Sequence, residues 1–262
     1  MQETVHLSGG NRADTGPEPA GPTPTNQFGQ PVGRSLPGWR PPPVPDGSLL
    51  QGRWCRLKPL DAEQHAAQLH AANTQAADGR AWTWLPVGPF DTASDYRQWV
   101  ESVQHRPDPF FYAVIVPDEA GEQAMGVAAL MRIDPPNGVI EVGHINLSPP
   151  LQRTRAATEA LTLLIGYGFS LGYRRFEWKC DSLNAPSRQA AVRLGFRFEG
   201  IFRQAIVTRG RNRDTAWFSI IDSEWPALAA AYARWLSPDN FDEQGRQRVS
   251  LRELTAALAP SV

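Results

Sequence analysis

The stretch of sequence best suited to chemistry is the turn at residues 148–158, which joins an expected strand at 139–147 to an expected helix at 154–171. A turn that runs directly into a helix presents free backbone N–H groups and the positive end of the helix dipole. Together these groups form an anion site that suits a pyrophosphate. An ordinary capped helix with two solvated arginines explains the same residues equally well.

The side chains of this turn favour an anion in three ways. Its arginines add positive charge, its threonine hydroxyls add hydrogen-bond donors, and its small alanines let an anion come close to the main chain. These residues are Arg153, Arg155, Thr154, Thr158, Ala156 and Ala157. On this turn alone, the two interpretations stay open.

A second group of polar residues is Asn184-Ala-Pro-Ser187, which lies between an expected strand at 174–180 and a short expected helix at 187–194. Asn184 can form an Asx turn and Ser187 can cap the helix, which ends at Gly195 as helices often do. Taken alone, this motif indicates helix capping rather than chemistry.

The elements that must position these motifs begin with three expected strands, at 110–116, 125–133 and 139–147. The residues between them are rich in Pro, Asp, Asn and Gly, so the strands are predicted to form an antiparallel meander. The strand–helix–strand unit that follows implies a right-handed crossover between two parallel strands. The expected fold class is α/β, with one mixed sheet and helices on both of its faces.

Other elements are expected on either side of this unit. Before it lie a strand at 50–57, a helix from Asp61 to Asn73 and a second helix capped by Ser94. After it come a hairpin of strands 196–207 and 215–221 around a basic loop at 209–214, and a last helix at 223–236.

The chain is predicted to have three parts. Residues 1–45 are rich in proline and glycine, so we expect an arm that is mostly disordered or lies extended along the body. Residues 46–236 form the folded domain, and residues 237–262 form a peripheral C-terminal tail.

The paired motifs, with a Gln-x-x-x-x-Ala turn before the first helix and Asn-x-x-Ser and Leu-Gly-Phe around the second, resemble the GNAT acetyltransferases. Within that superfamily the chain looks most like the branch that includes the ribosomal-protein N-terminal acetyltransferases. The resemblance covers residues 49–236. The family's acyl-CoA motif is usually Gln/Arg-x-x-Gly-x-Gly/Ala, so Gln152 and Ala157 match it, whereas Arg155 stands where the first glycine is expected.

The resemblance implies a GNAT-like fold that binds acetyl-CoA, with no metal. The turn would bind the pyrophosphate through Gln152, Arg153, Thr154, Arg155, Ala156, Ala157 and Thr158. Backbone groups of Asn146 and Leu147 would pair with the pantetheine arm in a gap between two splayed strands. Asn184 and Ser187 would line that arm.

Acetyl transfer to an amine needs a base, because a lysine amine has a pKa near ~10.4 and a free α-amine one near ~8. We prefer Glu141 as this base, directly or through water. His144 is second, since it lies on the opposite face of a flat strand unless a bulge intervenes. Many GNAT enzymes protonate the leaving thiolate with a tyrosine, but residues 190–193 contain none, so Ser187 is the expected donor.

The composition excludes several other classes of protein. The formal net charge of −1 gives no general attraction for nucleic acid or acidic membranes, which speaks against an RNA-binding module. The basic stretch at 203–213 could contact RNA or the 3′-phosphate of CoA, but Asp214 offsets one charge and a solvated hairpin tip is the favoured interpretation. Two distant cysteines argue against a disulfide framework or a zinc cluster. With no membrane-length apolar run and no secretory signal, we expect a cytoplasmic protein, either a monomer or a homodimer.

The sequence therefore predicts an N-acetyltransferase that moves an acetyl group from acetyl-CoA to a primary amine by direct transfer in a ternary complex. A protein N-terminus and a small-molecule amine are the two candidate acceptors. The alternative is a GNAT-like sensor that binds CoA without turnover.

Overall fold

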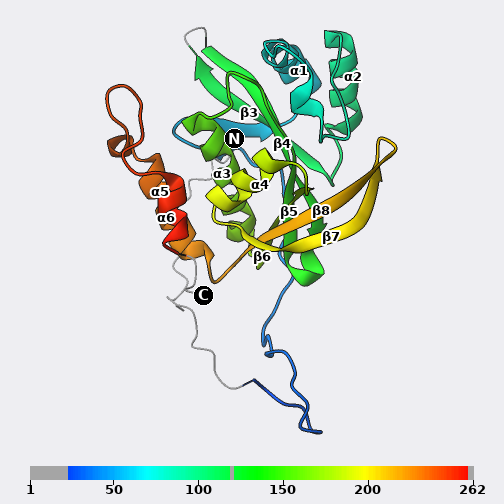
Figure 1. Ribbon diagram of the computed structural model, residues 1–262, viewed down its shortest axis with the longest axis vertical. Coiled ribbons are helices and arrows are strands. Elements are labelled where there is room, and N and C mark those ends of the chain that lie inside the picture. The colour runs from blue at the N-terminus through cyan, green and yellow to red at the C-terminus, as the bar shows by residue number, and fades with distance from the viewer. Residues whose placement is uncertain (1–22, 119–120, 259–262) are drawn as a thin grey trace.

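The computed structural model describes residues 23–118 and 121–258. Its strands form one eight-stranded sheet in the order β1-β2-β3-β4-β5-β6-β8-β7 (Figure 1). The β5–β6 pair is parallel and the other neighbouring pairs are antiparallel, so the predicted mixed sheet is confirmed. The strands are β1 Leu50–Gln51, β2 Arg56–Pro59, β3 Phe110–Asp118, β4 Gly121–Asp134, β5 Val139–Leu147, β6 Arg175–Asp181, β7 Arg197–Thr208 and β8 Arg211–Ile221.

Apart from the α-helix at Trp225–Leu236, the α-helices begin at side chains that cap them. Asp61 accepts from the N–H of Gln64, and Thr92, rather than the expected Ser94, accepts from the N–H of Asp95. Gly172 ends α3 in the left-handed region, with φ of 100°. The helices are α1 Ala62–Asn73, α2 Ala93–Val103, α3 Arg155–Leu171, α4 Ala185–Arg193, α5 Trp225–Leu236 and α6 Leu251–Ala256, with single 3₁₀ turns at Arg80–Trp82, Pro135–Asn137 and Pro238–Asn240.

The single strand expected at 50–57 is wrong, because the chain forms β1 and β2 with a loop between them. The buried carboxylate of Glu159 on α3 holds this loop by accepting the backbone N–H groups of Arg53, Trp54 and Cys55 at 2.6–2.9 Å. A carboxylate with several N–H donors is a strong local anchor. This contact joins residues over 100 positions apart, so local sequence does not reveal it.

The basic loop expected at 209–214 is also wrong in extent. Strand β8 continues to Arg211 and pairs with Thr208 of β7, so the turn is only Arg209-Gly210. Both turn residues have positive φ, of 48° and 69°, as two-residue hairpin turns require. Like charges at the tip therefore did not stop the pairing.

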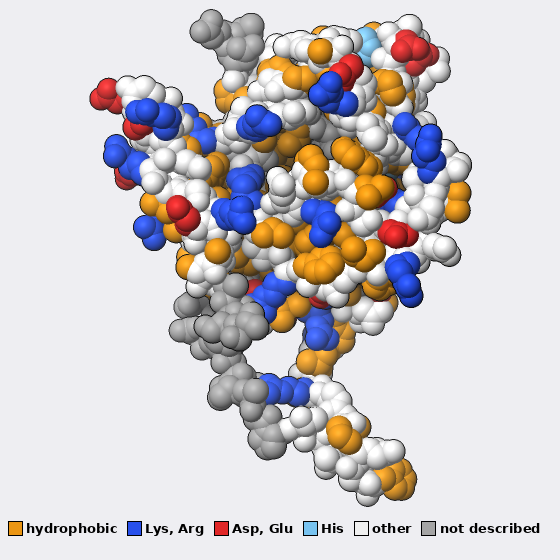
Figure 2. Space-filling view, viewed as in Figure 1, with side chains coloured by type: hydrophobic (Ala, Val, Ile, Leu, Met, Phe, Trp, Pro, Cys, Tyr) orange, Lys and Arg blue, Asp and Glu red, His pale blue; other side chains and the backbone are white. Residues whose placement is uncertain are grey.

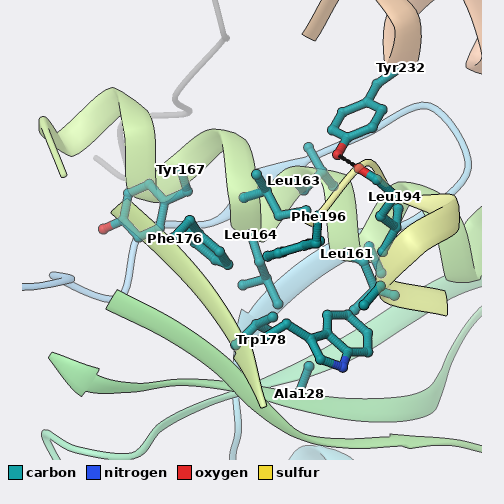
Figure 3. Packing of buried hydrophobic residues seen from close by; sticks show 14 of the residues in the cluster. Ala128, Leu161, Leu163, Leu164, Tyr167, Phe176, Trp178, Leu194, Phe196 and Tyr232 are labelled. Carbon is teal, nitrogen blue, oxygen red and sulfur yellow. Dashed lines mark hydrogen bonds between the residues drawn. The ribbon is translucent and has the colours of Figure 1, made fainter. Parts of the chain in front are cut away.

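Helices cover the two faces of the sheet unequally. Helices α3 and α4 pack on one face, where Leu161 and Leu164 of α3 lie against Phe176 and Trp178 of β6 (Figure 3). Helices α1 and α2 pack on the other face in a second apolar cluster that includes Phe111. That cluster contains residues of β3 and β4 but none of β6 or β8. On this second face, α1 and α2 therefore cover β3 and β4 but not β6 and β8.

Both ends of the described chain leave the main domain and touch it again. The arm extends away from the body in Figure 1, and Phe28 is exposed, but the indole N–H of Trp39 donates to the carbonyl of Pro136 at 3.1 Å. The tail, expected to be peripheral, contains α6, whose Leu251 is buried in the main core. Residues 1–22 of the predicted arm, 259–262 of the tail and 119–120 of the β3–β4 turn lie outside the described residues.

Candidate active site

A gap opens in the sheet where β5 and β6 diverge. The two strands pair in parallel only from Val139↔Arg175 to Val142↔Trp178. Beyond that point β5 stays paired with β4 and β6 with β8, so the facing edges of residues 143–147 and 179–181 do not pair with each other. Helices α3 and α4 both begin at this end. The carboxyl ends of neighbouring parallel strands are where open α/β sheets bind ligands.

The turn before α3 presents free backbone donors. In the described chain, the N–H groups of Arg153, Arg155 and Ala156 donate no hydrogen bond. The N–H group of Ala157 donates to the Thr154 hydroxyl at 3.1 Å. Arg153 has a φ of 63°, which bends the turn. The Gln152 side-chain amide donates to the carbonyl of Leu147 at 2.8 Å and ties the turn to β5. The turn therefore presents free main-chain donors, with Gln152 as a brace. The threonine hydroxyls expected to donate to an anion instead donate within the chain, that of Thr154 to the Leu151 carbonyl at 2.8 Å and that of Thr158 to the Thr154 carbonyl at 3.5 Å.

The turn needs no glycine at position 155, where the resemblance expects one, because Arg155 has a helical conformation. Arg155 is the first residue of α3, and the left-handed conformation falls on Arg153 instead. The guanidinium of Arg155 stacks between Trp54 and Phe241, at 4.0 and 4.6 Å from their ring centroids. Its side chain therefore supports the packing of the tail and the β1–β2 loop.

Arg193 on α4 adds a positive charge that the sequence interpretation missed. Its guanidinium donates to the hydroxyl of Thr158 at 3.0 Å, near the start of α3, and burial lowers its pKa. No carboxylate of the described residues forms an ion pair with it. Arg193 lies 35 positions from Thr158, so nothing in the local sequence links the two. In Figure 2, Lys and Arg side chains and few acidic ones lie over α3 and α4.

Buried polar atoms without partners mark the β5 side of the gap. Asn146 is only 5% exposed and Ser148 is fully buried, yet the Asn146 Oδ1 and Ser148 Oγ atoms form no hydrogen bond within the described chain. Buried polar atoms in folded proteins nearly always have a partner. These two atoms therefore fit a ligand that brings its own polar groups into the gap.

Helix α4 places the second motif at the other side of the gap. Asn184 caps the helix by accepting from the N–H of Ser187 at 3.1 Å, so the expected Ser187 cap is wrong by three residues. The hydroxyl of Ser187 accepts from the indole N–H of Trp178 at 3.0 Å. The Cys180 thiol is a further hydrogen-bond partner of this hydroxyl. Because sulfur is a weak acceptor, the Ser187 proton can turn from it to a ligand.

Glu141 lies in a buried cluster of charges. Its Oε2 atom is 3.0 Å from the Lys179 ammonium and 2.9 Å from the Arg132 guanidinium. The Lys179 ammonium is also 2.6 Å from Glu177 and 3.7 Å from the centroid of the Trp217 ring. The side chains of Glu141 and Lys179 are only 4% and 5% exposed. A buried ion pair is costly to break on one side, so this carboxylate is firmly held.

His144 lies on the same face of the sheet as Glu141. Strand β5 has a bulge there, since two of its residues, His144 and Ile145, lie opposite the single residue Ala128 of β4, and His144 has a φ of 48°. The imidazole contacts Phe111, with ring centroids 5.1 Å apart. Burial, followed by the charges of Arg106 and Arg132, lowers the pKa of His144 below its usual value of 6.5. The imidazole is therefore neutral, and able to accept a proton, near pH 7.

A family model described as an acetyltransferase (GNAT) domain matches residues 55–197, a stretch that runs from the start of β2 through α4. The chain belongs to the GNAT acetyltransferase family. The resemblance inferred from the two motifs is thereby confirmed, and with it the prediction of an acyltransferase. GNAT enzymes normally take their acetyl group from acetyl-CoA.

Individual GNAT proteins match between 39% and 84% of the chain. A GCN5-related N-acetyltransferase from Brucella melitensis is 49% identical and covers 84% of this chain and 100% of its own, with a TM-score of 0.81. The uncharacterized N-acetyltransferase p20 of Bacillus licheniformis is 29% identical over 57% of this chain and 84% of its own length. The ribosomal-protein-serine acetyltransferase of Escherichia coli is 35% identical over 39% of this chain and 58% of its own length.

Other features of this GNAT enzyme lie apart from the gap. A cleft of about 580 Å³ lies between the arm and the end of α2, and Val44, Gln104 and Phe110 are among its lining residues. None of the gap residues lines it. Within residues 23–118 and 121–258, no three His, Cys, Asp or Glu side chains gather to hold a metal ion. No helix of that same part is long and apolar enough to cross a membrane.

An Arg155→Pro variant of this GNAT enzyme is expected to bind CoA about 10-fold more weakly, the effect of losing one N–H donor to a charged group. Proline is tolerated at the first position of a helix. The preceding Thr154 is already extended, with φ of −93° and ψ of 166°, as residues before proline prefer. Calorimetry with CoA measures the change.

Arg155→Ala is the matched control for this variant. It removes the same stacking on Trp54 and Phe241 but keeps the N–H group, so its CoA affinity is expected to stay near that of the wild type. Equal affinities for the two variants would show that the Arg155 N–H does not bind the ligand.

Proposed function

We propose that this GNAT enzyme transfers the acetyl group of acetyl-CoA directly to a primary amine, in a ternary complex, with a protein N-terminus or a small-molecule amine as acceptor. The observation that carries the proposal is the gap itself. It has free N–H donors at one mouth, unpartnered buried polar atoms along one wall, and a proton acceptor and a proton donor beside it. The relative named a ribosomal-protein-serine acetyltransferase favours a protein acceptor.

In the proposed complex, the turn before α3 holds the diphosphate. The main-chain N–H groups of Arg153, Arg155 and Ala156 donate to its oxygens, and Arg193 adds charge from α4. Asn146, Ser148 and the unpaired edge of β5 take the amide groups of the pantetheine arm. Leu147 pairs with the arm through its N–H or through the second lone pair of its carbonyl oxygen, which already accepts from Gln152. Asn184 shapes the opposite wall as the cap of α4.

Two side chains manage the protons in this proposal. A base takes a proton from the amine as the amine nitrogen bonds to the acetyl carbonyl carbon. The carbon–sulfur bond then breaks, and the hydroxyl of Ser187 gives its proton to the departing thiolate. Ser187 recovers that proton from solvent, so the products are an amide and a free thiol.

The geometry favours His144 over Glu141 as the direct proton acceptor. His144 is neutral near pH 7 and takes part in no ion pair of the described residues, whereas the Oε2 of Glu141 already contacts two cations. Glu141 holds Lys179 and Arg132 in place. To serve as the base itself, Glu141 would take the amine proton through a bridging water. The β5 bulge places His144 and Glu141 on the same face of the sheet, so both side chains face the proposed amine.

Thioester consumption by the purified protein tests the proposal. Acetyl-CoA is supplied with a panel of primary amines that includes peptides with free N-termini, lysine-containing peptides and small amines. Free thiol is measured together with the mass of the acetylated product. We expect a gain of one acetyl group on at least one amine. Tight binding of acetyl-CoA with no acetylated product from any amine would overturn the proposal and leave a CoA-binding sensor.

A further inference from the structure

Strand β8 carries a row of buried hydrogen-bond donors without partners. Within the described chain, Arg213 Nε, Thr215 Oγ1 and Trp217 Nε1 are each buried and form no hydrogen bond. The residues occupy alternate positions of one strand, so their side chains lie on one face of the sheet. We call Arg213, Thr215 and Trp217 the donor row. Each such atom needs an explanation, and the shared face of these three lets one ligand supply all the missing partners.

The donor row lies on the same face of the sheet as Glu141 and His144, the two candidate bases. The intervening residues Ala216 and Phe218 belong to the core beneath α3, so the row faces the other way. Trp217 covers the Lys179 ammonium, which contacts Glu141. Thr215 pairs with Asp181, the last residue of β6, beside the gap. The row therefore borders the reaction centre from the side opposite α3.

The chemistry of these atoms defines what they bind. A guanidinium Nε and an indole Nε1 donate hydrogen bonds and never accept them, and a threonine hydroxyl can do both. Only oxygen or nitrogen atoms with lone pairs satisfy such a row. The neighbouring carboxylates Glu141, Glu177 and Asp181 form no hydrogen bond with the donor row in the described chain. Glu141 and Glu177 bind Lys179, and Asp181 accepts from the backbone N–H of Leu183. The partner must come with a ligand.

The hairpin around the row is positively charged. Arg203, Arg209, Arg211 and Arg213 form no ion pair with any described carboxylate, and Asp214 is the one acid within residues 203–214. The Arg209 guanidinium donates to the carbonyl of Gly88 at 2.6 Å, so the hairpin tip is tied to the loop before α2. Figure 1 shows β7 and β8 reaching from the sheet toward the side of α2. The arginine-rich hairpin therefore extends toward α2 on the face of β6 and β8 that carries no helix of the second apolar cluster.

We propose that the acceptor amine carries a carboxylate close to its reacting nitrogen, and that the donor row holds that carboxylate while the amine faces the acetyl group. This inference rests on the proposed function, in which the acceptor is a primary amine. Arg213 supplies the charge, Trp217 and Thr215 supply neutral donors, and Phe202, stacked on Trp217 with ring centroids 4.4 Å apart, fixes the indole. An acidic peptide N-terminus and a small amino dicarboxylic acid both present this chemistry.

Matched acceptors separate charge from shape. Three peptides of equal length with free N-termini carry Asp and Glu, Asn and Gln, or Lys and Arg at their second and third positions. Glutamate and glutamine amide, which has no carboxylate, form the corresponding small-molecule pair. Binding of each to the CoA-loaded enzyme is measured by calorimetry, and acetylation by mass. We expect the acidic member of at least one series to bind about 10-fold more tightly than its amide counterpart, as for a charge-assisted contact.

Variants of the donor row test the assignment to these residues. Trp217→Phe removes the N–H group but keeps a ring over Lys179, and Arg213→Gln removes the charge. Each is expected to bring the acidic-to-amide affinity ratio from about 10 toward 1. Arg252→Gln on α6 and Trp84→Phe, both outside the row, are the matched controls and should leave the ratio at its wild-type value.

The outcomes separate this inference from the proposed function. Equal binding of acidic and amide acceptors, or a ratio that survives both donor-row variants, overturns the inference even if amines are acetylated. Acetylation of no amine overturns the proposed function, and the binding ratio still decides whether the row recognises a carboxylate. The series that shows the ratio, peptide or free amino acid, identifies the source of the carboxylate.

Discussion

A Ser187→Ala variant is expected to acetylate its acceptor about 100- to 1,000-fold more slowly than the wild type, within the range typical of a lost general acid. The hydroxyl of Ser187 accepts from the Trp178 indole, which fixes the oxygen and leaves its proton for the thiolate. The loss should fall on kcat, because the side chain acts as the carbon–sulfur bond breaks rather than in binding. Steady-state kinetics with acetyl-CoA and one accepted amine measures it.

Two controls accompany this variant. Ser182→Ala changes a serine on the loop between β6 and α4, where only the main chain forms hydrogen bonds with described residues, and it should keep wild-type kcat. Ser187→Thr keeps a hydroxyl and should recover part of the rate. Because Ser187→Ala leaves the buried Trp178 N–H without a partner, its melting temperature and CoA affinity are measured first. Wild-type kcat in a folded, CoA-binding Ser187→Ala enzyme would contradict the donor role.

A His144→Gln variant is expected to lose about 100-fold or more in kcat, as for a general base. The pKa of His144 is lowered by burial and by the charges of Arg106 and Arg132, and the base is the neutral form. In the wild type, kcat should therefore rise with pH below pH 6.5, as His144 loses its proton, and become constant once His144 is neutral. We call this rise the acidic limb. The variant should lack this limb. Rates at a series of pH values with saturating substrates measure it.

Glu141→Gln is the companion variant that decides between the two bases. It removes the carboxylate charge from Lys179 and Arg132, whereas Lys179 keeps Glu177 at 2.6 Å, so we expect a loss of about 1.5–3 kcal/mol in the free energy of unfolding, the range for a hydrogen bond to a charged group. Its remaining folded fraction should keep the acidic limb. If instead His144→Gln keeps the limb and Glu141→Gln loses it, Glu141 is the base.

Local patterns in the sequence were sufficient to predict the meander, the crossover and the start of α3. Turn residues separate β3, β4 and β5, and the Thr154 cap with helical periodicity afterward sets the α3 boundary to within one residue. These features depend on residues within one turn or hairpin of each other. The anion turn and Asn184 were predicted for the same reason.

The parts that could not be predicted depend on contacts between distant segments. Arg193 meets Thr158 across 35 residues, and the arginine at position 155 has its ring partners at Trp54 and Phe241. The bulge at His144 follows from a register shift against β4, and no residue type at 144 announces it. Alternation along β8 could have suggested one face for Arg213, Thr215 and Trp217, but their lack of partners is visible only in three dimensions.

The central claim is that the main chain before α3 binds the diphosphate while the β5–β6 gap holds the thioester arm. NMR of ¹⁵N-labelled protein titrated with acetyl-CoA tests it most directly, because each backbone N–H reports its own environment. We predict that the amide signals of Arg153, Arg155 and Ala156, together with those of residues 143–147, shift along one saturation curve. Saturable binding that leaves these signals in place, or no binding at all, would contradict the account.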